Sequence, residues 1–327
     1  METTSKIIRS SIYIFLSNYH YFTISAILAL PFSASVLLSQ ALVPSSTLLP
    51  PIQIRLQALL NAAGLPSSSE IFNIFSLKLS QTITSTVLVL PFTFSFLILA
   101  KASVIKALSQ QKPSQIKIFS FISILSPIFS TQIWTSLLIL SANATSFSIL
   151  TIAYNFLDVY KLLSTSTSIV LFSAAAAILY SIILANAFVI SNLAVVLSGM
   201  EAKGGCISLL KACVLIKGRN SKAISLALPL NLALAAIEAL FQYRAVAVLS
   251  SNGFPNFSMT LECIVIAYLY SIFIVLDTII SCMFFRSCRT AFLVEDQNRY
   301  SHCIDISKYN QDHIISCAKL KSIEELP

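Results

Sequence analysis

Long apolar runs separated by short polar stretches make up most of this chain. Six of the runs are nearly free of charge and reach roughly 20 residues, the length that a helix needs to cross the hydrocarbon core of a bilayer. They cover residues 21–43, 79–100, 118–142, 169–198, 223–249 and 260–285. The pattern predicts an all-α fold, a polytopic membrane helical bundle of six transmembrane helices.

The six runs divide the chain into three parts. We expect residues 1–20 to form a cytosolic N-terminus, residues 21–285 a six-span membrane domain, and residues 286–327 a cytosolic tail. The first run is too long for the apolar core of a signal peptide, so we interpret it as an uncleaved first span.

Two segments between the spans have apolar residues near helical spacing, which predicts short amphipathic helices at the membrane interface. One covers residues 52–63, around a single Arg55. The other covers residues 205–217, where a glycine pair begins the helix and Gly218 ends it.

Residues 146–163 combine an apolar stripe with polar groups. Asn155, Asp158 and Lys161 are costly in lipid, so we expect an interfacial or re-entrant helix. A seventh span is the alternative. It would move the basic residues of 201–222 to the opposite side of the membrane, against the charge bias described below.

Composition agrees with a membrane protein. The chain is 56% hydrophobic and 10% charged, whereas soluble domains carry about 25% charged residues. The net charge of +8 does not indicate nucleic acid as a partner, because the basic residues lie between apolar blocks instead of clustering on one soluble face. Seven cysteines without a C-x-x-C spacing predict no disulfide framework.

The basic residues also predict orientation, because Lys and Arg that flank short loops stay in the cytosol. With six spans, seventeen of the 21 Lys and Arg residues fall on one side, including Lys101, Lys106, Lys112 and Lys117. The other four are Arg55, Lys78, Lys161 and Arg244. We therefore expect both termini in the cytosol and the glycosylation sequons at Asn143 and Asn256 on the opposite side. Whether these sequons are glycosylated is left open. The membrane is expected to be endomembrane (ER) or plasma membrane.

The stretch Val-Val-Leu-Ser-Gly-Met-Glu-Ala-Lys-Gly-Gly at 195–205, continued to 219, resembles a signature of plant multi-pass membrane proteins of uncharacterised role. More loosely, residues 195–243 are similar to the membrane domain fused to some glycerophosphodiester phosphodiesterases. The resemblance implies a six-span plant endomembrane or plasma-membrane protein. The soluble phosphodiesterase barrel is missing, so no catalytic residue is carried over.

Three polar groups fall inside the predicted spans, namely Asn231, Glu238 and Asp277, and the first two share a helix face. Ionisable groups cost at least about 2.5 kcal/mol in hydrocarbon, so they are candidates for function. One interpretation places them on a transport path. The other makes them hydrogen-bonding contacts between packed helices.

Other candidates lie on the cytosolic side. The basic residues around 205–217 are candidates for binding anionic lipid headgroups: Lys203, Lys211, Lys217, Arg219 and Lys222. Cys282 and Cys288 flank the membrane edge and are candidates for palmitoylation. His302, Cys303, His313 and Cys317 match no zinc spacing.

No hydrolase, zinc-protease or P-loop motif occurs in the chain. We therefore predict no catalytic residue, no metal and no cofactor. The leading hypothesis is a non-enzymatic membrane protein that organises lipid or partner proteins. Its expected ligands are membrane lipids, and its protein partner is either a second copy of the chain or another membrane protein. The alternative is a small-solute or ion transporter or channel that uses the polar groups in the fifth and sixth spans.

Overall fold

The computed structural model describes residues 4–43, 49–62, 70–109, 118–160, 166–250, 258 and 260–290. These residues are helical throughout apart from short turns, and no strand occurs among them. Their order is α1 (Thr4–Ser17), α2 (Tyr19–Leu42), α3 (Leu49–Ala62), α4 (Glu70–Phe92), η2 (Thr93–Leu97), α5 (Ile98–Ser109), α6 (Ile118–Val159), α7 (Ser166–Glu201), α8 (Cys206–Ile216) and α9 (Asn220–Ser250). A further helix runs from Thr260 to Thr290 and is called the 260–290 helix.

Six helices in the described part of the chain are long and apolar enough to cross a membrane. They are Tyr19–Leu42, Ser76–Ser109, Ser123–Leu157, Val170–Glu201, Asn220–Arg244 and Thr260–Thr290. The prediction of an all-α bundle with six candidate spans is therefore confirmed. The chain is an integral multi-pass membrane protein by this criterion.

The second span is longer than the predicted 79–100. Pro91 has no N–H to donate, and the helix widens just after it into the π-helical turn η2. Thr93 and Ser95 donate hydroxyl hydrogen bonds to the carbonyls of Val89 and Pro91, at 3.1 and 2.7 Å. The helix then continues as α5, so Lys101 and Lys106, which follow the predicted span, lie in a helix as well.

The third span is also longer than predicted. Residues 146–159 continue α6 as one 42-residue helix, so they form neither a separate interfacial helix nor a re-entrant one. Their apolar stripe faces α7, as shown by the contact between the Tyr154 and Phe172 rings, whose centroids are 6.2 Å apart. Asn155 is half-buried in this helix, while the side chain of Asp158 and all of Lys161 lie outside what the structure describes.

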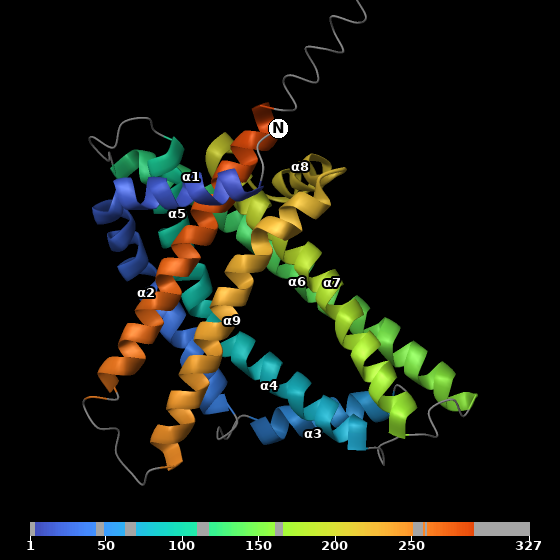
Figure 1. Cartoon of the computed structure of the whole chain (residues 1–327). Helices are drawn as coiled ribbons and strands as arrows, with labels where there is room; N and C mark the ends of the chain where they lie inside the picture. Colours follow the sequence, from blue (N-terminus) through green and yellow to red (C-terminus); the bar gives the residue numbers. More distant parts are fainter. Residues whose placement is uncertain are drawn as a thin grey trace, which may run out of the picture.

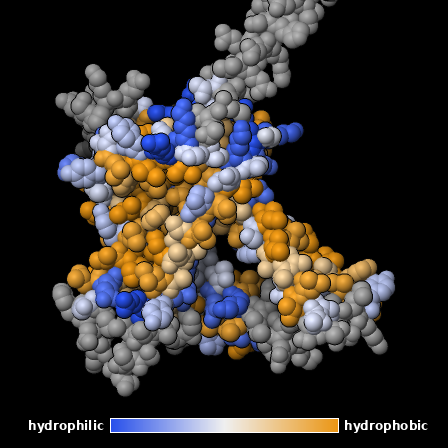
Figure 2. Space-filling view, in the orientation of Figure 1, coloured by the Kyte–Doolittle hydropathy of each residue, from blue (hydrophilic) through white to orange (hydrophobic). Residues whose placement is uncertain are grey.

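Figure 1 shows two parts of the membrane domain. One part is a bundle of α2, η2, α5, α9 and the 260–290 helix, with a core that includes Phe22, Ile98, Val275 and Ile279. The other part is the α6–α7 arm, an antiparallel hairpin that leaves the bundle near α8 and runs away from it. Figure 2 shows hydrophobic residues around the middle of the molecule and a hollow between the arm and the bundle.

Short helices cover the two ends. Helix α1, within the predicted N-terminus, lies across one end and buries Ile7 and Ser11 against the bundle (Figure 1). Helix α8 lies at the same end, and α3 lies at the opposite end beside α4. Residues 52–62 of the expected interfacial helix are thus part of α3, and residue 63 lies outside the described residues.

Glycines fix the joint between the arm and the bundle. A Cβ on Gly204 would lie 2.5 Å from the carbonyl oxygen of Pro127 in α6, and one on Gly199 would lie 2.8 Å from Ile105 in α5. Gly205 adopts a φ of +83° and donates its N–H to the Thr131 hydroxyl at 2.9 Å. The glycines near the end of α7 therefore allow backbone packing that a side chain would prevent.

Candidate functional site

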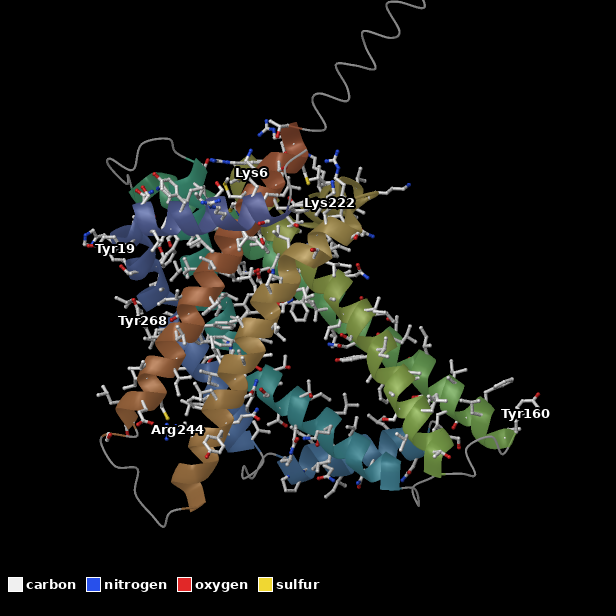
Figure 3. All side chains as sticks on the ribbon, in the orientation of Figure 1. Lys6, Tyr19, Tyr160, Lys222, Arg244 and Tyr268 are labelled. Carbon is white, nitrogen blue, oxygen red and sulfur yellow. The ribbon has the colours of Figure 1, made fainter. Side chains whose placement is uncertain are left out.

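The basic residues gather at the end of the molecule that carries α1 and α8. Figure 3 shows Lys6 and Lys222 at this end and Arg244 at the other. Helix α1 adds the exposed side chains of Lys6 and Arg9 to this surface. The sequence placed these residues in the cytosol but did not predict that a helix would hold them against the bundle.

Helix α8 matches the predicted amphipathic helix at 205–217, with one face packed and the other exposed. Ser208, Ala212 and Ile216 are buried. The opposite face carries an apolar row in which Ile207, Leu210 and Val214 are each at least 60% exposed. Since a folded protein does not usually leave such a row to water, this face is suited to the headgroup and acyl boundary of a bilayer.

The five predicted headgroup ligands have different surroundings. Lys211 forms an ion pair with Glu201 at 2.7 Å, and the Arg219 guanidinium donates to the carbonyl of Cys288 at 3.1 Å. These two side chains therefore also hold α8 and the loop after it in place. Lys203, Lys217 and Lys222 are exposed around the helix. All five lie near α8, as the sequence predicted.

Inside the membrane domain, Asp277 belongs to a polar row across three helices. The Lys101 ammonium of α5 donates to the Asn192 side-chain oxygen of α7 at 3.2 Å, and the Asn192 amide donates to the Asp277 carboxylate at 3.0 Å. A cavity of about 30 Å³ adjoins this row and is also lined by Ser281 and Phe284. That volume is enough for about one water molecule.

Glu238 belongs to a second, separate network. Its carboxylate accepts hydrogen bonds from the Gln40 amide of α2 at 3.1 Å and from the Tyr270 hydroxyl of the 260–290 helix at 2.8 Å. Gln242 in turn donates to the side-chain oxygen of Gln40 at 2.7 Å. The carboxylate joins three helices of the bundle.

The three predicted intramembrane candidates therefore do not meet at one site. Asn231 is exposed on α9, and Glu238 and Asp277 have different partners. Sequence reasoning missed Lys101 and Asn192. The signal for Lys101 was the stretch 98–109, which continues with good helix formers and has no glycine or proline to end the helix.

The structure corrects the choice of cysteines for palmitoylation. Cys282 is 0% exposed and Cys288 is 3% exposed, because both face the bundle core. Acyl transfer needs an accessible thiol, so neither fits that role. Cys206 and Cys213 on α8 are exposed instead.

The remaining sequence candidates add no site in the described residues. Asn143 lies within α6 and its side-chain oxygen accepts from the Tyr180 hydroxyl of α7 at 3.0 Å, whereas a glycosylated asparagine sits in a surface loop. It therefore no longer supports the predicted orientation. Asn256, His302, Cys303, His313 and Cys317 lie outside the described residues. Within those residues, no group of three or more His, Cys, Asp or Glu side chains could hold a metal.

Comparison with known proteins identifies a family. No curated protein and no solved structure matches the chain. Neither the plant family nor the relation to glycerophosphodiester phosphodiesterases is tested by these comparisons, so both stay predictions. One family model, described as "Domain of unknown function (DUF8558)", matches residues 3–314. The match covers nearly the whole chain, and the protein therefore belongs to this family.

Proposed function

We propose that this protein is a non-enzymatic component that organises lipid, and that its basic end holds anionic headgroups on the cytosolic side of an endomembrane or plasma membrane. The observation that carries the proposal is the exposed face of α8. There an apolar row, Ile207, Leu210 and Val214, lies between exposed lysines. Apolar residues beside basic ones are what binds a helix to an anionic bilayer surface.

The expected strength follows from the charges. A basic residue near an anionic surface contributes about 1 kcal/mol, so Lys203, Lys217 and Lys222 together give roughly 3 kcal/mol in favour of anionic over neutral headgroups. Lys6 and Arg9 of α1 lie at the same end and add to this attraction. The attraction is electrostatic, so it should weaken as salt is raised.

The cytosolic placement of this end rests on the same charges. Lys6 and Lys222 lie at one end of the molecule, whereas Arg244 lies at the other (Figure 3). By the positive-inside rule, this distribution supports a cytosolic position for α1, α8 and both termini. The resemblance of residues 195–219 to plant membrane proteins supports a plant endomembrane or plasma-membrane setting.

Trp134 offers a direct test, because it is the single tryptophan of the chain and lies beside the start of α8. Its indole nitrogen is 3.8 Å from where a Cβ on Gly205 would sit. Bromine-labelled lipids quench tryptophan fluorescence on contact. Full-length protein should be reconstituted with equal amounts of brominated lipid that carries either an anionic or a zwitterionic headgroup.

We expect stronger quenching by the anionic lipid, and loss of that excess in the triple variant Lys203→Gln, Lys217→Gln, Lys222→Gln. The matched control is Arg55→Gln with Lys78→Gln, which removes two exposed basic residues from helices α3 and α4. The control should keep the excess. Equal quenching by the two lipids in the unmodified sequence would overturn the proposal.

Transport is the second candidate, and the cavity beside Asp277 is the observation that favours it. Asn231 and Glu238 lie apart from that cavity, so the path would use the row of Lys101, Asn192 and Asp277 instead of the three groups chosen from the sequence. Ion flux should be measured in vesicles with Asp277→Asn and, as control, Glu238→Gln. A flux that Asp277→Asn leaves unchanged would remove this candidate.

A further inference from the structure

Two thiols lie on one exposed stripe of α8. Cys206 and Cys213 are seven residues apart in an 11-residue helix, and that spacing brings them within about 20° of each other around the helix axis. Both side chains are exposed. They differ in this from Cys282 and Cys288, which are buried in the bundle.

The surroundings of these thiols indicate what they could carry. Leu210 lies between them along the helix, and it is 60% exposed, as part of the apolar row described above. A chain attached to either sulfur would enter the same apolar layer that this row faces. Lys217, at the end of the helix, is exposed, and its charge would keep this end of α8 close to anionic headgroups.

We propose that Cys206 and Cys213 are sites of S-acylation by long-chain fatty acyl groups. Cysteines on amphipathic helices beside a membrane are the usual targets of this modification. The proposal goes beyond headgroup binding and shares with it only the position of α8 at the cytosolic surface. It also differs from the sequence prediction, which applied the same reasoning to two cysteines that the fold buries.

The chemistry is a thioester exchange. The cysteine thiolate attacks the carbonyl carbon of a fatty acyl-coenzyme A, a new sulfur–carbon bond forms, and the coenzyme A thiolate leaves and takes up the proton that the cysteine lost. No oxidant or reductant is needed. Partial desolvation by its neighbours raises the pKa of the exposed Cys213 thiol, so less of it is thiolate at neutral pH, and we expect an acyltransferase to be required at that position.

The test is to count thioesters on the full-length protein made in eukaryotic cells. Free thiols are blocked, thioesters are cleaved with hydroxylamine, and each released thiol is tagged with a maleimide polymer that shifts the band on a gel. We expect Cys206→Ser and Cys213→Ser each to lose one tag, and the double variant to lose two. Cys282→Ser and Cys288→Ser are the matched controls and should lose none.

Two results would overturn the proposal: no tag on the unmodified sequence, or the same number of tags on the double variant as on the unmodified sequence. Size-exclusion profiles in detergent show whether each variant is folded. The tryptophan experiment uses protein made in bacteria, which carries no acyl groups. Failure of headgroup binding and failure of acylation are therefore seen in separate measurements.

Discussion

The bundle and the α6–α7 arm are both built from apolar helices, but they bury very different shares of their surfaces. In the 260–290 helix, half of an apolar 18-residue window is buried, whereas in the corresponding 18-residue windows of α6 and α7 only 6% is. From residue 136 to residue 186, Ser146 is the only buried side chain among those that the structure describes. The outer half of the arm therefore packs on itself and leaves the rest of its surface to lipid.

The comparison shows what hydropathy does and does not determine. The 260–290 helix and α7 have similar mean hydropathies in these windows, 2.4 and 2.1. Both belong in a bilayer because of it. Their neighbours are decided by sparse polar and small residues, since lipid tails give no hydrophobic drive for helices to associate. Glu238 makes such a contact within the bundle, Asp277 joins the bundle to Asn192 of α7, and the outer arm has Asn143 with Tyr180.

The largest effect should come from breaking the polar row of Lys101, Asn192 and Asp277, which joins the bundle to α7. Asp277→Asn removes the negative charge and leaves the Lys101 ammonium without it inside the membrane domain, which should cost about 3–5 kcal/mol of unfolding free energy. Lys101→Met removes the positive charge near Asp277, and it should lower the unfolding free energy by a similar amount. Thermal unfolding in detergent measures both changes.

The double variant with both changes sharpens this result. It removes the two opposite charges together, so its loss of stability should be smaller than the sum of the two single losses. Additive losses would mean that Lys101 and Asp277 are stabilised by separate surroundings. The row through Asn192 would then be a coincidence of packing.

A smaller effect is expected at the base of the arm, where the segment after α7 approaches α6. Gly204→Ala places a methyl group 2.5 Å from the Pro127 carbonyl oxygen, and overpacking of this kind costs about 1–3 kcal/mol. The matched control is Gly218→Asn. Gly218 has a φ of +82° and no atom within 4 Å of an added Cβ, and asparagine tolerates that conformation.

The measurements are the melting temperature and the rate of proteolysis of the arm. Gly204→Ala should lower the melting temperature and speed proteolysis, because α7 is held against α6 at this point. Gly218→Asn should change neither measurably. Similar losses in the two variants would show that the loop conformation, and not the close approach to Pro127, determines stability here.

The six spans could be predicted from the sequence because hydropathy summed over about 20 residues does not depend on which neighbours a helix has. Predictions failed where neighbours decide the outcome. The predicted second span ends before Lys101, although Asn192 links this lysine to Asp277 inside the fold. Cys282 and Cys288 were placed at an accessible edge, although the packing of the 260–290 helix buries them.

The amphipathic helix α8 could be predicted for the opposite reason. Its glycines, its apolar spacing and its basic residues are local features, and they mark a helix at an interface without reference to the rest of the fold. Helix α1 carries similar signals, with Lys6 and Arg9 among apolar residues, but its position depends on α2 and α9. The sequence does not contain that information in a local form.

The smallest effect should come from the arm itself. Tyr180→Phe removes the hydroxyl that donates to Asn143 at 3.0 Å, and hydrogen bonds between membrane helices contribute about 0.6 kcal/mol on average.

The matched change in the bundle is Tyr270→Phe, which removes the hydroxyl that donates to Glu238 at 2.8 Å. This change affects a carboxylate, and hydrogen bonds to charged groups are worth about 1.5–3 kcal/mol. Melting temperatures should therefore fall further for Tyr270→Phe than for Tyr180→Phe. The reverse order would mean that polar contacts hold the arm more firmly than the bundle, and the distinction between the two parts would rest on buried surface alone.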